Sequence, residues 1–262
     1  MLASVVFVPS APLLVPALCG PMAHDAEPIR TATLAAAAEL ASAARSWVAI
    51  GAGDGSATSF DAGSVGTFAG YGVDVPVTLS AGSPIPAVRG ASRAAPIPEV
   101  RGASRATKGR APLPLSMLIA GWLREQVAVE SVRPIVVNPD ATAEDCARIG
   151  VTLATELDAD PDPVGVLVVG DGAISLTAKS PGGGLRPTAV ELQARLDAAI
   201  GDADLGALAE LDVAECATEG VGGRAAWQVA AALCAGRDVK SEKLCTEAPF
   251  GVGYIVARWT PQ

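Results

Sequence analysis

Four polar side chains stand near the ends of short apolar runs, where they could take part in chemistry. Ser10, Asp54 and Asp171 each follow a run rich in valine or isoleucine, and Ser56 lies two residues beyond Asp54. In parallel α/β sheets, ligands bind beyond the carboxyl ends of the strands. Two carboxylates that share one crevice can hold a hard cation or separate their pKa values for acid and base catalysis. Alternatively, each aspartate caps its own loop through backbone hydrogen bonds.

His24 is the single histidine of the 262 residues, and this scarcity excludes every mechanism that needs two imidazoles. Dinuclear sites, two-histidine iron sites and zinc sites built from histidines are therefore not expected. A serine nucleophile needs a base beside it, and only His24 could activate Ser10. Because His24 lies in a short segment before the first long helix, we interpret it as a surface residue in a turn.

The remaining motifs give no support for a nucleotide, zinc or disulfide site. The loop Gly51-Ala52-Gly53-Asp54-Gly55-Ser56 has the spacing of neither known glycine-rich phosphate motif, and Asp54 would repel a phosphate. The five cysteines are odd in number and contain no C-x-x-C pair, so we expect buried, reduced thiols. They are Cys19, Cys146, Cys216, Cys234 and Cys245.

Composition and charge favour a cytoplasmic protein that handles small molecules. The formal net charge of −9 disfavours binding to nucleic acid or to an anionic membrane, because both are polyanions. A secretory signal carries a lysine or arginine before its apolar run, and here none precedes the first apolar run. No apolar stretch approaches the roughly 20 residues that cross a bilayer. Because 50% of the residues are hydrophobic but only 4% are aromatic, the core is expected to consist of aliphatic side chains.

Apolar runs and helical segments alternate along the chain. This order predicts one α/β domain over residues 1–262, with a mostly parallel central sheet covered by helices on both faces. Near the C-terminus, a glycine-interrupted strand is expected to close one side of the sheet. The predicted strands are 3–8, 46–50, 134–137, 164–169 and 251–259, and residues 239–244 alternate apolar and charged side chains. The predicted helices are 27–45, 115–127, 141–157 with Asp140 or Thr142 as the N-cap, 187–200 and 224–234.

A tandem repeat interrupts this pattern. Residues 84–95 recur at 96–107 with only two differences, which indicates a duplication inside a surface loop. Residues 84–110 carry six of the 19 lysines and arginines but only one of the 28 acidic residues. We expect this basic loop to be solvated, to contact the protein's own acidic surface, or to contact an anionic partner.

The loop motifs resemble those of the class III extradiol ring-cleavage dioxygenases, in particular the catalytic B subunit. The resemblance covers most of the chain except the repeat loop, and it suggests a divergent bacterial member. It rests on residues 9–16 (Pro-Ser-Ala-Pro-Leu-Leu-Val-Pro), Gly170-Asp171, residues 66–74, residues 227–229, and residues 248–254 (Ala-Pro-Phe-Gly-Val-Gly-Tyr).

The resemblance implies an α/β fold, a non-haem Fe(II) held by two histidines and a carboxylate, and a third histidine for acid/base catalysis. None of the three imidazoles is present at the matching positions. Ser10 stands where the first ligand is expected, Gly53-Asp54-Gly55 where the second is expected, and residues 170–174 where the catalytic histidine is expected. Fe(II) is therefore disfavoured. Glu247 lies near the family's carboxylate ligand, and an oxygen set of Asp54, Asp171 and Glu247 would prefer Mg²⁺, Mn²⁺ or Ca²⁺.

Two hypotheses follow from these observations. The first is a dioxygenase-like protein that has lost iron-dependent ring cleavage and binds a small molecule or a partner, with no cofactor. The second is an enzyme that uses Asp54 and Asp171 as acid/base groups or as ligands of a hard metal. The pocket residues under both hypotheses are Ser10, Asp54, Ser56, Asp171 and Glu247. The resemblance also allows a homodimer.

Overall fold

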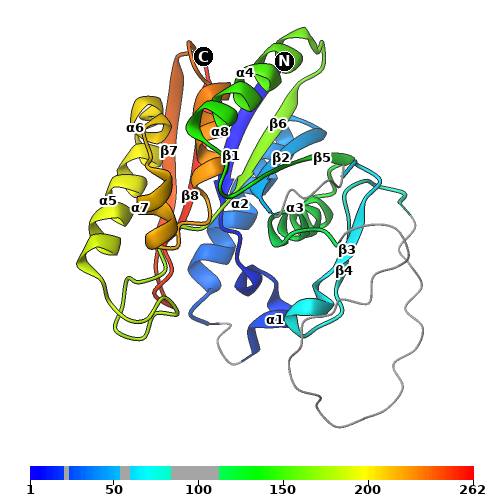
Figure 1. Cartoon of the computed structure of the whole chain (residues 1–262). Helices are drawn as coiled ribbons and strands as arrows, with labels where there is room; N and C mark the ends of the chain where they lie inside the picture. Colours follow the sequence, from blue (N-terminus) through cyan, green and yellow to red (C-terminus); the bar gives the residue numbers. More distant parts are fainter. Residues whose placement is uncertain (21–23, 54–59, 84–111) are drawn as a thin grey trace, which may run out of the picture.

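The computed structural model describes residues 1–20, 24–53, 60–83 and 112–262. A six-stranded sheet forms its centre, with the strand order β5-β2-β6-β1-β8-β7 (Figure 1). A separate two-stranded sheet pairs β3 (Val65–Thr67) with β4 (Pro76–Thr78). The expected α/β fold with a mostly parallel central sheet is therefore confirmed.

Four neighbouring strands of the central sheet are parallel. They are β5 (Ser131–Val137), β2 (Ser46–Ala52), β6 (Val164–Val169) and β1 (Leu2–Val8). Every residue of β6 is buried, as expected for a strand inside a sheet that is covered on both faces. Because these strands run in one direction, their carboxyl ends lie along the same edge of the sheet.

The last two strands complete the sheet in antiparallel fashion. β8 (Tyr254–Pro261) pairs with β1, and β7 (Val239–Glu247) pairs with β8 at the outer edge. The C-terminal segment thus closes one side of the sheet as predicted, but its glycines precede β8 rather than interrupting it. At the edge, β7 carries alternating charges, including Lys240 and Glu242, which discourage strand pairing with another chain.

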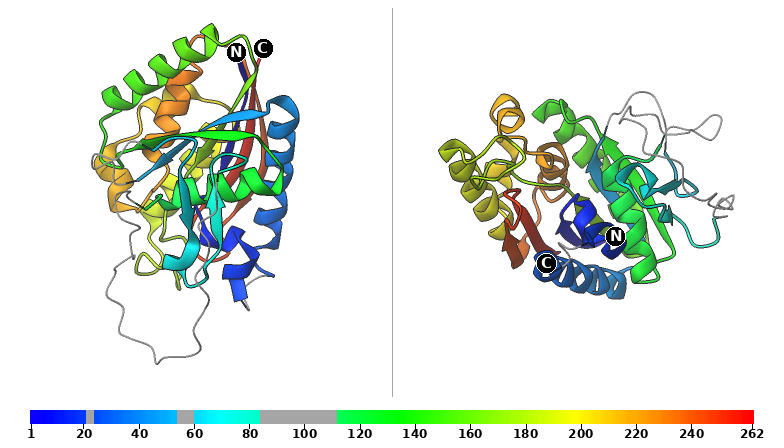
Figure 2. Two further views of the ribbon diagram at one scale, coloured as in Figure 1. Left: turned by 90° about the vertical axis from the view of Figure 1, so that its right-hand side faces the viewer. Right: turned by 90° about the horizontal axis from the view of Figure 1, so that it is seen from below.

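Two apolar layers form because alternate residues of the strands face opposite sides of the sheet. Val5 and Phe7 of β1 pack with α4 (Ala143–Ala159), α5 (Pro187–Gly201) and α8 (Arg224–Leu233). Val6 and Val8 pack in the other layer. That layer contains α2 (Glu27–Ala43) and α3 (Leu115–Gln126), and the views in Figure 2 show helices on both sides of the sheet.

The predicted helices agree closely with the observed ones. Thr142 is the N-cap of α4, where its hydroxyl accepts a hydrogen bond from the Asp145 amide. Proline occupies the first turn of α2 and of α5, where its missing N–H leaves no bond unmade. By contrast, β5 begins three residues before its predicted start, because its ladder with β2 continues to Ser131.

The sequence patterns did not predict several short helical elements one by one, and they did not predict the β3–β4 hairpin. A three- or four-residue element shows too little periodicity to be recognised. The repeat prediction for residues 84–110 lies outside the described residues. The short helical elements are η1 (Pro12–Leu14), α1 (Pro16–Cys19), η3 (Phe68–Tyr71), α6 (Leu205–Ala209) and α7 (Val213–Thr218).

All five cysteines are free, and four of them are buried. Burial raises the pKa of the Cys216 thiol to about 11 and that of Cys234 to about 12, so both stay protonated near neutral pH. The expectation of free, buried thiols is thus confirmed for four cysteines, whereas Cys245 is only half-buried. Within the described ranges, no helix has both the length and the apolar character needed to cross a membrane.

Candidate functional site

The candidate site lies where β1 and β6, two adjacent parallel strands, end at the same edge of the sheet. Ser10 and Asp171 follow these strands, and the Ser10 backbone amide donates a hydrogen bond of 2.7 Å to Oδ1 of Asp171. The Gly170 amide also donates to the Val8 carbonyl at 3.0 Å, which extends the pairing beyond the ends of the strands. The structure therefore brings together two of the predicted site residues that are 161 positions apart.

The backbone around Asp171 is fixed by contacts from two other elements. The Asp171 carbonyl accepts a hydrogen bond from Gly223, which directly precedes α8. The Gly172 amide donates to the Gly253 carbonyl at 2.8 Å, and the Gly253 amide donates to the Ala173 carbonyl at 2.9 Å. The Gly-Asp-Gly loop is thus joined to the loop that leads into β8.

Close packing explains the glycines of this region. A Cβ at Gly170 would lie 2.4 Å from the Gly223 Cα, where no side chain fits. Gly251 has a φ of +75°, and a Cβ there would lie 1.9 Å from the Ser180 hydroxyl oxygen. Gly170 and Gly251 therefore serve the close approach of backbone segments at this site.

Asp171 is partly buried, and burial raises the pKa of its carboxyl to about 7 against the opposing effect of the Ser10 amide. Its Oδ2 accepts no hydrogen bond from the described part of the chain, and no lysine or arginine there compensates its charge. Desolvation disfavours the ionised form of a carboxyl group that has no positive partner. Asp171 therefore has substantial protonated and ionised populations near neutral pH.

Tyr254, at the start of β8, is the site residue that the sequence patterns did not reveal. Its side chain is 4% exposed. Burial raises the pKa of its phenol, and the negative charge of nearby Asp171 raises it further. The phenol therefore stays protonated and can donate a hydrogen bond. The only sequence signal was its place at the end of the Gly251-Val252-Gly253 motif.

Glu247 is exposed at the end of β7, in cross-strand register with Tyr254. The structure shows no hydrogen bond or ion pair that joins it to Asp171 within the described ranges. Asp54 and Ser56 lie outside those ranges, although the strand that precedes them, β2, is next to β6. Across the residues that are described, no three histidine, cysteine or acidic side chains are grouped so that they could hold a metal ion.

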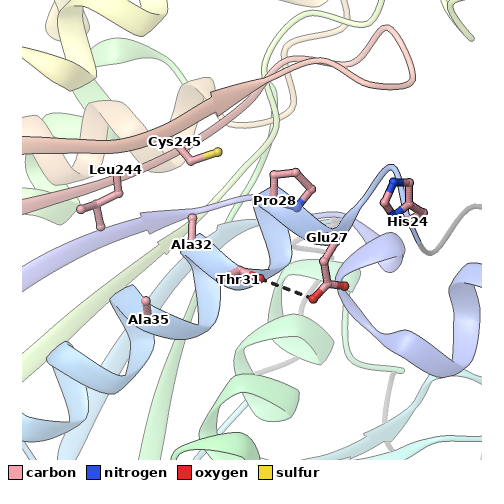
Figure 3. A pocket seen from close by; sticks show the side chains of 8 residues that line it. All are labelled: His24, Glu27, Pro28, Thr31, Ala32, Ala35, Leu244 and Cys245. Atoms are coloured by element: carbon pink, nitrogen blue, oxygen red, sulfur yellow. Dashed lines mark hydrogen bonds between the residues drawn. The ribbon is translucent and has the colours of Figure 1, made fainter.

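No hydrogen bond or ion pair among the described residues joins His24 to Ser10 or Asp171. His24 is exposed in the turn before α2, as predicted, and lines an open hollow of about 600 Å³ between α2 and β7 (Figure 3). The walls are mainly apolar, and Ser10, Asp171 and Glu247 take no part in them. The other lining residues are Glu27, Pro28, Thr31, Ala32, Ala35, Leu244 and Cys245.

The fold and the site define an α/β protein with a partly buried carboxyl group at the carboxyl ends of its parallel strands. Comparison of the sequence with models of known protein families and with curated proteins found no match.

Proposed function

We propose that this chain is a protein of the extradiol dioxygenase B-subunit type that binds a small molecule at the strand-end site and does not perform iron-dependent ring cleavage. The observation that carries the proposal is the contact between the Ser10 amide and Asp171 at the ends of β1 and β6. This edge is where parallel α/β sheets bind ligands. A carboxyl group there that no described lysine or arginine compensates is costly to maintain, and such groups are common at functional sites.

The residues present do not fit the iron centre that the resemblance implies. A two-histidine, one-carboxylate site cannot be formed by a chain whose single histidine is exposed beside α2. Ser10 presents a hydroxyl at the position of the first imidazole ligand. The Gly170-Asp171 pair is followed by Gly172, Ala173 and Ile174 where the catalytic histidine is expected. We therefore derive no step through Fe(II).

The groups at the site favour a ligand with an acceptor oxygen. Protonated Asp171 and the Tyr254 phenol both donate hydrogen bonds, and neither carries a positive charge. A carbonyl or phenol oxygen satisfies such donors without bringing a full charge into a partly buried site.

Ligand binding is tested by thermal unfolding with a panel of small ketones, phenols and catechols at pH 6. We expect at least one class to stabilise the wild-type protein and to lose its effect in Asp171→Asn. The matched control is Asp158→Asn, because Asp158 pairs with Arg237 near the C-terminal end of α4 rather than near Asp171. If no compound stabilises the wild-type protein, or if both variants behave alike, the binding site is not here.

The loss of iron chemistry is tested separately by metal analysis and a catechol-cleavage assay of the protein supplied with Fe(II). We expect substoichiometric iron and no ring-opened product. Stoichiometric iron together with ring-opened product would overturn this part of the proposal. The same thermal measurement with Mg²⁺, Mn²⁺ or Ca²⁺ alone, compared with an Asp54→Ala, Asp171→Ala double variant, tests the oxygen-ligand set.

A second candidate function is acid/base catalysis by Asp171, which the pKa of about 7 favours. A general base is most effective when its pKa lies near the working pH. As a carboxylate, Asp171 would remove a proton from the carbon next to a ketone, and the Tyr254 phenol would donate a hydrogen bond to the enolate oxygen. The probe is deuterium exchange at that carbon of acetone or acetylacetone. A rate that rises through pH 7 and is abolished in Asp171→Asn supports catalysis, whereas a rate equal to that in buffer excludes it for these substrates.

A further inference from the structure

Gln193 is a buried polar residue of α5 whose side chain reaches the loop that carries Asp171. Its Oε1 accepts a hydrogen bond of 2.8 Å from the Ala173 amide, two residues after Asp171. Only 7% of the residue is exposed. A buried amide that makes this bond restrains the backbone of the loop, because breaking it leaves two polar groups unsatisfied.

The same amide group also packs against both glycine loops of the site. A Cβ at Gly172 would lie 2.0 Å from Oε1 of Gln193, and a Cβ at Gly253 would lie 2.1 Å from the same atom. These glycines directly adjoin Asp171 and Tyr254 in the chain. The Gln193 amide thus lies against the junction where the two loops exchange backbone hydrogen bonds.

Asp197, one helical turn further along α5, fixes the orientation of the Gln193 amide. Nε2 of Gln193 donates to Oδ1 of Asp197 at 2.7 Å. Burial raises the pKa of the Asp197 carboxyl, while this hydrogen bond and the charge of Lys243 in β7 favour its ionised form. An ionised carboxylate only accepts hydrogen bonds, so the amide must turn its N–H₂ toward Asp197. Its oxygen is then directed at the Ala173 amide.

We infer that Gln193 is a positioning residue of the strand-end site, which holds Asp171 against the Ser10 amide and beside Tyr254. The inference rests on the proposed function for the importance of that geometry. The groups that face Asp171 in the described part of the chain are the Ser10 amide from the β1 loop and the Tyr254 phenol from β8. Those that face the Gln193 amide are the Ala173 amide and Asp197, with Lys243 next to Asp197.

The test is the titration of the Asp171 carboxyl group, followed by carbon NMR in the absence of any ligand. Gln193→Met keeps the length and approximate volume of the side chain but removes both hydrogen bonds. We expect the loosened loop to admit water to the carboxylate and to lower the titration midpoint by at least one pH unit, a tenfold rise in the acid dissociation constant.

Gln228→Met is the matched control. Gln228 is also a buried glutamine, but within α8 it accepts a hydrogen bond from Arg224, and it donates to the carbonyls of Ala209 and Leu211. Its loss should reduce stability without moving the Asp171 midpoint by more than about 0.3 pH units. If the midpoint shifts equally in both variants, Gln193 has no specific effect on Asp171 and the inference is wrong. An unchanged midpoint in Gln193→Met would also overturn it.

Variants of the partly buried Asp197 keep the inference testable if Gln193→Met does not fold. Asp197→Asn still offers an acceptor oxygen to Nε2 of Gln193 and should keep the wild-type midpoint, whereas Asp197→Ala should lower it. Equal midpoints in these two variants would contradict the orienting role. Because no ligand is used, this titration is independent of the ligand-binding test. If Gln193→Met lowers the Asp171 midpoint but no compound stabilises the wild-type protein against thermal unfolding, the proposed function is refuted and the positioning role is retained.

Discussion

Asp171 combines two properties that a surface aspartate lacks, namely partial burial and a hydrogen bond from the backbone of a distant loop. Both Ser10 and Asp171 could be proposed from sequence, because each follows a recognisable strand and polar residues after parallel strands reach the same edge. Tyr254 and Gln193 could not, because their places depend on how β8 and α5 pack against the Asp171 loop. Gln193 belongs to no local pattern that distinguishes it from an ordinary core residue, and the motif that ends in Tyr254 assigned that residue no role.

At the residue scale, the first prediction concerns how stability depends on pH. The pKa of Asp171 is about 7 in the folded chain, against 3.8 for an aspartate that is fully exposed to water, so the folded state binds the proton more tightly. This contribution to stability is complete below about pH 4 and is lost as the pH rises through 7. One pKa unit corresponds to about 1.4 kcal/mol, so the difference between about 7 and 3.8 gives a loss on the order of 4 kcal/mol.

Urea unfolding of the wild-type protein and of Asp171→Asn at pH 5 and pH 8 measures this contribution. The asparagine variant cannot ionise, so its stability relative to the wild type should be greater at pH 8 than at pH 5. The Asp158→Asn control should show no such gain at high pH. If the wild-type and Asp171→Asn unfolding free energies change in parallel with pH, the assigned titration is wrong.

At the scale of elements, the contact between α4 and α8 depends on a glycine. A Cβ at Gly150 of α4 would lie 2.5 Å from the Val229 carbonyl and 2.6 Å from the Ala232 Cβ, both in α8. Sequence periodicity predicted both helices, and capping chemistry offered Asp140 or Thr142 as the N-cap of α4. Neither signal indicated that the two helices touch at Gly150, because a glycine inside a helical pattern does not show which element packs against it.

We predict that Gly150→Ala destabilises the protein by about 1–3 kcal/mol, because the obstructing atoms include helix backbone that cannot move aside. Gly206→Ala in α6 is the control, since the nearest atom to its Cβ is Asp204 Oδ1 at 3.5 Å. Its stability should be unchanged or higher by up to about 1 kcal/mol, as alanine favours helix. Chemical denaturation of both variants checks the prediction, and equal effects would contradict the close packing of α4 on α8.

At the scale of the whole molecule, strand order unites the loops of the site. The sequence predicted strands and helices in alternation but did not determine that β2, β6 and β1 would be consecutive neighbours in the sheet. Nor did it determine that β8 would lie beside β1 with Tyr254 close to Asp171. This order places the segments around residues 10, 53 and 171 at one edge.

The basic repeat gives a prediction at the same scale. Residues 84–110 are rich in proline, glycine and arginine, and contain little large apolar side-chain area to bury. We therefore expect a chain without this segment to retain its unfolding free energy within about 1 kcal/mol. Thermal and urea unfolding of the shortened chain test this expectation, which a loss of several kcal/mol would contradict. Capture of partners by the two chains from a lysate then separates an interaction role of the segment from ligand binding.

The sequence by itself determined the α/β class, most element boundaries, the exposed place of His24 and the candidacy of Ser10 and Asp171. These follow from interactions that are local in the chain: side-chain periodicity, proline and glycine constraints, and helix capping. Only the tertiary structure decided that the Ser10 amide bonds to Asp171, that Tyr254 lies near Asp171 and that Gln193 bonds to the loop after Asp171. Such contacts join residues that are far apart in the chain, so they depend on strand order and on which helix covers which face of the sheet.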